Sequence, residues 1–392
     1  MLKGRTLKNP DEWIARDAAM AMLGVRPQTL YAYVSRGLLR ARPDAADPRR
    51  SAYSGHDIEG LLARKRGSRR RADIATGAIA WGEPVLESAI STVRDGRLIY
   101  RGRDASEFAS RATLEDTAAL LWQYAPPSNA VVQNSAAARQ AARSSQCRPR
   151  AFAFLAHAAG IDAPSFGRST ALLQAEAWDL LSGFANAAAG MTGHVPIHLR
   201  LAGHWGLGRP RSELVRRVLV LVSDHELNAS TFAVRVAAST GASLAAAALA
   251  GFSALSGPLH GQASARALAF LDRMLTSSDM AGYVRAVVAR GEPVLGFGHQ
   301  LYPLGDPRAA SLLRAVRPRA AIARALRIAE IEVGAPPNVD MALAVTTREL
   351  GLPDEAPFIM FSIGRMAGWL AHAIEQRETG RLIRPRARYV GE

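Results

Sequence analysis

Residues 296–310 read GFGHQLYPLGDPRAA, a stretch in which one imidazole, that of His299, stands among residues that shape the backbone. Glycine lets a backbone approach a ligand closely, and proline fixes the direction in which the chain continues. The pattern therefore indicates that His299 is held in a defined position. The same stretch ends in Asp-Pro-Arg, which adds the guanidinium of Arg308 to the imidazole.

Further stretches carry imidazole, carboxylate and guanidinium groups along the second half of the chain. They are SDHELNASTF with His225, SGPLHGQAS with His260, PPNVDMAL with Asp340, SIGRMAGW with Arg365 and RLIRPRARYVG with Arg384. Together with GFGHQLYPLGDPR, these stretches resemble the citrate synthase family in order and spacing, over roughly residues 75–392. Any one of them alone would be a weak signal, but six in one order make chance an unattractive explanation.

The resemblance implies a reaction: condensation of acetyl-CoA with oxaloacetate, followed by hydrolysis of the citryl thioester to citrate and CoA. Asp340 matches the aspartate that removes a proton from the thioester methyl group. His260 matches the histidine that donates a hydrogen bond to the developing enolate oxygen. His299 matches the general acid that protonates the acceptor ketone.

The resemblance also implies how the substrates are bound. Oxaloacetate carries two carboxylates, and guanidinium groups bind carboxylates through paired hydrogen bonds. Arg308 and Arg365 match the arginines of one subunit, with His225 as a further donor, while Arg384 matches an arginine from the neighbouring subunit. A homodimer with shared active sites is therefore implied. The coenzyme A thioester is a co-substrate, no metal or permanently bound cofactor is expected, and four residues are assigned to coenzyme A binding: Leu295, Gly296, Phe297 and Gly298.

Four positions depart from the family pattern. Gln300 and Pro303 stand where family members often have Arg and Lys, and HGQAS carries Gln262 and Ser264 where HGGAN is common. None of the four is assigned to bond making, so they concern the binding of the CoA phosphates and the acyl-CoA that is preferred. Two alternative functions stay open: 2-methylcitrate synthesis from propionyl-CoA, and a citrate synthase-like sensor domain of a transcription regulator.

The composition indicates which elements position these residues. The 392-residue chain is 48% hydrophobic but only 6% aromatic, and alanine supplies much of this share, which favours helices. We expect a mainly α fold of large and small helical subdomains over residues 75–392, the small one at roughly 262–350. The pair Asp95-Gly96 between apolar runs predicts one hairpin. The uncharged segment 236–259 is rich in Ala, Gly and Ser, so we interpret it as the central core helix and not as a membrane span.

The N-terminus, the single cysteine and the remaining histidines are not assigned to a functional site. The N-terminus lacks the apolar run of a secretory signal, and Cys147 is a lone cysteine in an expected loop, so we expect an inert thiol and a cytoplasmic protein. His194 and His198 are four residues apart, as metal ligands can be, but Gly193 and Pro196 argue against a continuous helix face. Four further histidines are interpreted as core or surface groups: His56, His157, His204 and His372.

The first 75 residues are basic. They contain 16 Lys or Arg against 8 Asp or Glu, so about a fifth of the chain carries +8 of the net charge of +15. Positive charge concentrated in one module points towards a polyanion, and double-stranded DNA is the first candidate. A solvated arginine-rich surface is the plainer explanation of the same charge.

The order of residues in this module is more specific than its charge. Residues 15–23 predict a helix, Gly24 and Val25 predict a tight turn, and residues 27–35 predict a second helix. With the turn-rich wing RPDAADPRRSAY and a third helix after Ser54, residues 1–66 resemble the winged helix-turn-helix of the MerR and excisionase families. Residues 67–74 are interpreted as a basic linker. Five residues are predicted to contact DNA, with protein contacts as the alternative: Gln28, Thr29, Tyr31, Tyr33 and Arg36.

Overall fold

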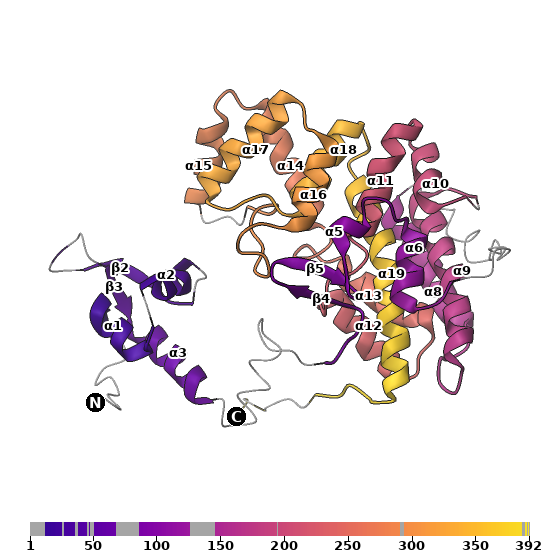
Figure 1. Ribbon diagram of the computed structural model, residues 1–392, viewed down its shortest axis with the longest axis horizontal. Coiled ribbons are helices and arrows are strands. Elements are labelled where there is room, and N and C mark those ends of the chain that lie inside the picture. Colours follow the sequence, from indigo (N-terminus) through magenta and orange to yellow (C-terminus); the bar gives the residue numbers. More distant parts are fainter. Residues whose placement is uncertain are drawn as a thin grey trace. The chain divides into compact units, whose positions relative to one another are not determined.

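The computed structural model describes residues 12–25, 27–35, 38–44, 47, 51–67, 86–125, 146–193, 195–290, 294–385, 389 and 391. The chain divides into two compact units, residues 1–87 and residues 88–392. The first unit contains a small sheet with helices, and the second contains most of the helices of the chain (Figure 1).

The first unit is built on a three-stranded antiparallel sheet. Its elements are β1 (Trp13–Ala15), α1 (Arg16–Leu23), α2 (Pro27–Ser35), β2 (Ala41–Pro43), β3 (Ser51–Ser54) and α3 (Gly55–Gly67). Strand β3 lies between β1 and β2. Leu23 of α1, Leu30 of α2, Tyr53 of β3 and Ile58 of α3 are buried in one core, so every layer of the unit contributes to it.

The helix, turn and helix predicted at 15–23 and 27–35 are present as α1 and α2. Gly24 ends α1 in the left-handed region with φ +63°, and its N–H donates to Met20 O at 2.9 Å. Ser54 Oγ accepts a hydrogen bond from Asp57 N at 3.3 Å, so the third helix begins at the expected cap. Helix α3 continues to Gly67, one residue into the predicted linker, and residues 68–74 lie outside the described residues.

The second unit is mainly helical, which confirms the predicted fold class. Its small sheet has the order β4 (Ser91–Arg94), β5 (Arg97–Tyr100), β6 (Arg103–Asp104). Its helices are α5 (Ala105–Phe108), α6 (Leu114–Trp122), α8 (Cys147–Ile161), α9 (Thr170–Ala189), α10 (Ile197–His204), α11 (Arg209–Leu221), α12 (Ala229–Ser239), α13 (Leu244–Leu255), α14 (Ala263–Thr276), α15 (Met280–Ala289), α16 (Pro307–Val316), α17 (Ala320–Val333), α18 (Val339–Leu350) and α19 (Ala356–Thr379).

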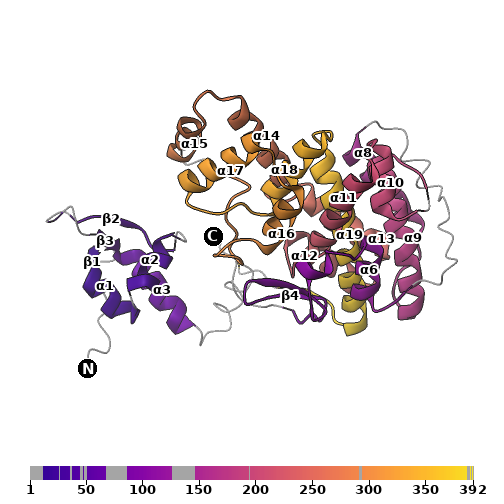
Figure 2. The ribbon, with the colours of Figure 1, turned by 45° about the horizontal axis from the view of Figure 1, so that its top comes forward.

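These helices enclose two hydrophobic cores. The larger core surrounds α19, which packs against α6, α9, α11, α12 and α13. The smaller core lies among α14, α15, α17 and α18, and its buried side chains run from Ala267 to Val345. Figure 2 shows α14, α15 and α17 gathered at one side of this unit and α8, α9 and α10 at the other. Helix α16 joins them, because Leu312 is buried in the larger core and Leu313 packs against both.

Helix α19 approaches the end of α11 closely because two glycines face that end. A Cβ atom added to Gly364 or Gly368 would lie closer than 3.0 Å to atoms of residues 219–224. The N–H of Gly368 instead donates to Ser223 O at 3.1 Å. Glycines four residues apart share one face of a helix, so α19 can place Arg365 beside the chain that leads to His225.

The prediction of one central helix at 236–259 is wrong. The segment spans the end of α12 and all of α13, and Gly241 between them adopts φ +81°. Ser243 then caps α13 by accepting a hydrogen bond from Ala246 N at 3.2 Å. The central helix is α19, with 24 residues. Among the described residues, no helix is long and apolar enough to cross a membrane.

Two smaller expectations have different outcomes. The hairpin predicted at Asp95-Gly96 is present between β4 and β5, with φ values of +51° and +72° that suit the mirror-image turns of hairpins. The loop predicted around Cys147 is wrong, because Cys147 is the first residue of α8 and is buried. Burial raises the pKa of its thiol to about 12, which favours the unreactive thiol that the sequence indicates.

Candidate active site

The segment 294–306 holds His299 against the chain that enters α18. Gly296 and Gly298 adopt φ values of +106° and +69°, which residues with side chains rarely adopt. The N–H of Gly298 donates to Pro336 O, and the N–H of Asn338 donates to Gly296 O, both at 2.8 Å. These two bonds explain why the glycines flank the imidazole: they let the backbone fold onto a second segment.

The imidazole of His299 is a hydrogen-bond donor at Nε2. The N–H of Leu301 donates to His299 Nδ1 at 3.1 Å, so Nδ1 must offer a lone pair. Burial and the positive charge of Arg308, partly opposed by Asp306, lower the pKa of His299 to about 4. The ring is therefore neutral at pH 7 and keeps its proton on Nε2.

His225 lies beside His299, with ring centres 5.0 Å apart. Nε2 of His225 is 2.9 Å from the hydroxyl of Tyr302, whose ring is also 5.0 Å from that of His299. Burial, followed by the charge of Arg308, lowers the pKa of His225 well below its ordinary value. Two neutral imidazoles and a phenol thus lie together, with His225 and Tyr302 buried and His299 half-buried.

The turn that carries His225 is anchored by its two acidic neighbours. Glu226 Oε1 accepts a hydrogen bond from Val93 N of β4 at 2.5 Å. The fully buried carboxylate of Asp224 accepts a hydrogen bond from the hydroxyl of Ser91 and lies 3.2 Å from Nε2 of His372. The interpretation of His372 as a core residue therefore agrees with its place, and its neighbour Asp224 holds the turn.

Arg308 forms a buried ion pair at the start of α16. Its Nε and Nη2 donate to Asp306 at 3.0 and 2.8 Å, and Asp306 also accepts from Val339 N at 3.0 Å. Burial alone would lower the pKa of Arg308, but the carboxylate of Asp306 outweighs it and raises the pKa. The guanidinium lies 5.4 Å from the ring centre of Tyr302, which places it next to the two imidazoles.

Arg365 is a buried cation in the middle of α19. Its Nε donates to Val222 O at 2.9 Å, and its guanidinium stacks 4.7 Å from the ring centre of Phe361. Within the described part of the chain, no carboxylate forms an ion pair with Arg365. Burial, partly opposed by Asp224, lowers the pKa of Arg365 to about 10. A buried guanidinium that forms no ion pair with the described carboxylates favours an anionic ligand.

His260 follows α13 and contacts a shared hydroxyl. Its Nε2 is 2.9 Å from Ser230 Oγ, which also accepts a hydrogen bond from Trp369 Nε1 at 3.2 Å. Ser230 Oγ is in turn 2.7 Å from Asn228 Oδ1. Burial and the charge of Arg365 lower the pKa of His260 to about 4, so this ring is neutral as well.

Asp340 lies in the first turn of α18 and is fixed by two neighbours. Asn338 caps the helix by accepting from Asp340 N at 3.0 Å, and Ser264 Oγ donates to Asp340 Oδ1 at 2.6 Å. Burial raises the pKa of Asp340, while the hydrogen bond from Ser264 and the charge of Arg308 oppose that rise. A carboxylate with a raised pKa is a better base than an exposed one.

The structure brings most of the predicted residues into one cluster. His225 and His299 are in ring contact, and the charges of Arg308 and Arg365 act on the imidazoles and on Asp340. Arg384 does not join the cluster within this chain, because it lies beyond the end of α19 and is exposed. Four residues of the cluster were not assigned from the sequence, although all lie in or near the quoted stretches: Ser230, Ser264, Tyr302 and Asp306.

The four residues assigned to coenzyme A binding differ in the groups that a ligand could contact. Phe297 turns its side chain into the smaller core, where its ring lies 6.2 Å from that of Phe270, and it forms a β-bridge with Pro337. Gly296 and Gly298 offer backbone only, and Gly298 O already accepts from Asn338 Nδ2 at 2.9 Å. Leu295 is half-buried beside them.

The residues predicted to contact DNA lie on or just after α2. Thr29 is exposed, but Tyr33 is half-buried and packs against the core of the first unit, so its ring does not point fully outward. The side chains of Gln28 and Tyr31 and the whole of Arg36 lie outside the described residues. His194, one of the two histidines whose spacing resembles that of metal ligands, also lies outside the described residues. The other, His198, is buried in α10.

These observations first define a class: a helical protein with two cores and a site that combines a carboxylate of raised pKa, neutral imidazoles and buried guanidinium groups. The model of the family described as "Citrate synthase, C-terminal domain" matches residues 79–188 and 199–386. The chain therefore belongs to the citrate synthase family.

Two curated relatives are similar to part of the chain. Citrate synthase 2 of Bacillus subtilis is 38% identical over 189 residues, which cover 46% of this chain and 51% of that protein. 2-Methylcitrate synthase 1 of Corynebacterium glutamicum is 33% identical over 185 residues, covering 45% of this chain and 49% of that protein. The chain spans about half the length of the curated relatives that it matches.

The fold is similar to that of a solved structure. Citrate synthase of the thermophilic archaeon Thermoplasma acidophilum, in a ternary complex with carboxymethyl coenzyme A and oxaloacetate, matches with a TM-score of 0.68 at 22% identity. The match covers 79% of this chain and 94% of that one. At this identity the likeness shows the fold, which is the mainly helical fold of citrate synthases.

Proposed function

We propose that this protein condenses acetyl-CoA with oxaloacetate to give citrate and CoA. One observation carries the proposal: a carboxylate with a raised pKa, two neutral imidazole donors and an unpaired buried guanidinium occupy one site. Proton removal beside a thioester carbonyl needs such a base and donor, and a dicarboxylate needs such a guanidinium. The coenzyme A and oxaloacetate complex of the Thermoplasma protein supports the choice of substrates.

The first step is enolate formation. Asp340 takes a proton from the methyl group of the thioester, and the electron pair moves onto the carbonyl oxygen. His260 donates a hydrogen bond to that oxygen from Nδ1. In the structure the hydroxyl of Ser230 donates to Asn228 Oδ1, and the proposed step requires that it turn to His260 Nε2, which is also in reach. When the hydrogen goes to His260, the ring proton stays on Nδ1, the tautomer that this step requires.

The second step forms the carbon–carbon bond. The enolate carbon attacks the ketone carbon of oxaloacetate, and the ketone oxygen takes the Nε2 proton of His299. Arg308 and Arg365 bind the carboxylates, with His225 as a further donor. Water then hydrolyses the citryl thioester, which breaks the C–S bond and releases citrate and the thiol of CoA. Water returns a proton to His299 and removes the one on Asp340, so the site is restored.

The test is release of free thiol by the purified full-length chain with acetyl-CoA and oxaloacetate. We expect turnover in the wild-type protein and a fall of at least about a hundredfold in Asp340→Asn, the effect of losing a general base. Binding of oxaloacetate should change little in this variant. Asp354→Asn is the matched control, because Asp354 is exposed and pairs only with Arg348 among the described residues. Absence of thiol release from the wild-type protein, or full turnover in Asp340→Asn, would contradict the proposal.

The second candidate is 2-methylcitrate synthesis, which the similarity to the Corynebacterium enzyme favours. The acceptor and the bond-making residues are the same, and only the acyl group changes from acetyl to propionyl. The same thiol assay with propionyl-CoA decides between the two. A larger kcat/KM for propionyl-CoA than for acetyl-CoA assigns the protein to 2-methylcitrate synthesis.

For the first unit we propose a winged helix-turn-helix that binds double-stranded DNA. The turn at Gly24 between α1 and α2, with the β2–β3 hairpin as the wing, supports this proposal. We also propose that the protein is a homodimer that works in the cytoplasm, where acyl-CoA and DNA are both present. Paired recognition helices would then read a two-fold symmetric site.

Selection from random duplexes tests the DNA proposal. We expect one enriched sequence, binding that weakens steeply as salt rises, and loss of binding when residues 1–71 are deleted while thiol release persists. Absence of any sequence preference would contradict it. A selected sequence whose affinity responds to oxaloacetate, in a protein without turnover, would instead establish the sensor alternative.

A further inference from the structure

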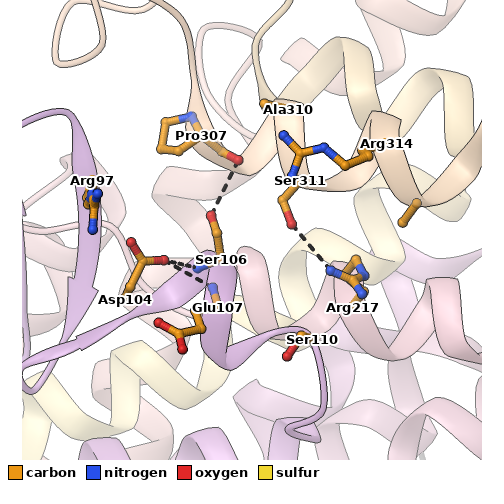
Figure 3. Close-up of a pocket in the computed structure, with 11 residues that line it drawn as sticks. Arg97, Asp104, Ser106, Glu107, Ser110, Arg217, Pro307, Ala310, Ser311 and Arg314 are labelled. Atoms are coloured by element: carbon orange, nitrogen blue, oxygen red, sulfur yellow. Dashed lines mark hydrogen bonds between the residues drawn. The ribbon is translucent and has the colours of Figure 1, made fainter.

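A cavity of about 610 Å³ lies outside the proposed active site, between β5, α5, α11 and α16 (Figure 3). Its walls belong to distant parts of the chain, since Arg97 comes from β5, Arg217 from α11 and Arg314 from α16. None of the residues assigned to condensation lines it. The volume falls within the range of cavities that bind small molecules.

Three arginines line this cavity. Among the described residues, neither Arg97, Arg217 nor Arg314 forms an ion pair, and Arg217 makes only a long hydrogen bond of 3.4 Å to Ser311 Oγ. Burial and the charge of Arg216 lower the pKa of Arg217; Glu213 opposes this shift, and the charge of Arg314 adds a smaller effect that lowers it. An anion between Arg217 and Arg314 would relieve the repulsion between these two guanidinium groups and accept hydrogen bonds from them.

The wall opposite Arg217 and Arg314 carries the carboxylates of Asp104 and Glu107 together with Arg97 (Figure 3). Asp104 caps α5, because its Oδ1 accepts from the N–H groups of Ser106 and Glu107 at 2.8 and 3.0 Å. The carboxylate of Glu107 accepts no hydrogen bond within the described part of the chain, and Figure 3 shows it on the side of the cavity away from Arg314. A ligand that fits both walls carries negative charge at one end and hydroxyl or amino donors at the other.

The cavity also faces the helix that carries Arg308. Pro307, Ala310, Ser311 and Arg314 line it at the spacing of one helix face. Helix α16 contacts α11 of the larger core and α18 of the smaller one. A ligand between Arg217 and Arg314 would therefore bridge α11 and α16.

We propose that this cavity is a binding site for a small phosphorylated metabolite, whose phosphoryl group lies between Arg217, Arg314 and Ser311 and whose hydroxyl or amino groups meet Glu107. The site is separate from the proposed condensation site, because none of the residues assigned to condensation lines the cavity. A phosphoryl group is preferred to a carboxylate because the guanidinium groups come from several directions, which suits a tetrahedral anion better than a planar one.

Calorimetric titration of the full-length protein with pyrophosphate at constant ionic strength tests the site. We expect saturable binding that weakens about tenfold in Arg217→Ala and in Arg314→Ala, since each removes a charge-assisted contact. Arg314 is exposed, so its variant keeps the test valid if the half-buried Arg217 is needed for folding. Arg324→Ala is the matched control: Arg324 is an exposed arginine of α17 that does not line the cavity, and binding should be unchanged.

Three results would overturn the proposal. The first is absence of saturable binding of pyrophosphate to the wild-type protein. The second is binding with equal affinity in Arg314→Ala and the wild type, because that would place the anion elsewhere, for example at Arg308 and Arg365. The third is tighter binding of succinate than of pyrophosphate at the same site, which would exclude the phosphoryl class.

Discussion

At the scale of single residues, the proposed base depends on a hydroxyl at a position where the sequence departs from its family. Ser264 stands where HGGAN has Asn, and its Oγ donates to Asp340 Oδ1 at 2.6 Å. This bond stabilises the ionised carboxylate, whereas burial destabilises it and raises the pKa of Asp340. The departure therefore concerns the base itself, and not only coenzyme A binding.

Ser264→Ala should move the acidic limb of the pH profile of kcat/KM to higher pH. Asp340 must be ionised to accept a proton, and loss of the donor raises its pKa, so activity is lost at a higher pH as the solution is acidified. At the plateau, kcat/KM should fall by up to about tenfold, the scale of one hydrogen bond to a charged group. Steady-state kinetics from pH 4 to 9 give both quantities.

Ser253→Ala is the control for this variant, because Ser253 is an exposed serine of α13 whose hydroxyl donates to Leu249 O. It should leave the profile unchanged. The pKa values of His260 and His299, lowered to about 4, leave both rings half protonated at the acidic end of this range and neutral at pH 7. An acidic limb near pH 6.5 that does not respond to Ser264→Ala would show that a histidine, and not Asp340, controls it.

The residue scale also shows what the sequence could predict. The resemblance to the citrate synthase family, which rests on six stretches in one order, singled out His225, His260, His299, Arg308, Asp340 and Arg365. The structure places these residues near one another, and their catalytic and binding roles stay predictions. Sequence patterns could not predict the tautomers of the imidazole rings or the pKa values of the site residues. They depend on contacts such as Ser230 with His260 and Tyr302 with His225, which join positions 30 and 77 residues apart.

At the scale of elements, the site depends on how closely α19 approaches α11. Gly368→Ala would place a Cβ closer than 3.0 Å to Ser223 O, a backbone atom that cannot move away cheaply. We expect the free energy of unfolding to fall by about 1–3 kcal/mol, the cost of overpacking. Urea denaturation monitored by circular dichroism measures it.

Gly160→Ala is the matched control for that change. Gly160 also lies in a helix, α8, but a Cβ there meets no atom within 4 Å. Alanine is the better helix former, so this variant should be unchanged or more stable by up to about 1 kcal/mol. Equal effects at the two glycines would contradict the close-approach argument.

The elements were predicted best where glycine or proline residues mark the end or start of a helix or a turn. Gly24 marks the end of α1, Pro27 marks the start of α2, and Asp95-Gly96 marks the hairpin. The segment 236–259 was misassigned because its Ala-rich pattern continues through the break. The signal was present in Thr240-Gly241 and in the cap Ser243, but helices also tolerate single glycines, so the break depends on packing.

At the scale of the whole molecule, the open question is the proposed role of Arg384. In this chain it is exposed and outside the cluster, which agrees with a residue that serves a partner subunit. Sequence could suggest such a role only through the family resemblance, because no local pattern reports which subunit an arginine serves. The proposal is tested by mixing two inactive variants.

Arg384→Ala and Asp340→Asn chains should each have little activity alone but should recover some when subunits exchange. A mixed dimer has one site with both wild-type groups, so random exchange should restore about a quarter of the wild-type activity. Thiol release after mixing measures the recovery, and mass spectrometry of tagged chains verifies the exchange. Complete exchange without recovery would contradict a shared site.

The division of the site between two cores has a chemical consequence. Asp340 stands on α18 and borders the smaller core, whereas Arg365 and the turn of His225 belong to the larger one. The electrostatic coupling between Asp340 and Arg365 therefore crosses from one core to the other. Under the proposed condensation, the carboxylate that takes the proton and the guanidinium that binds the anion keep their spacing only while the two cores stay packed together.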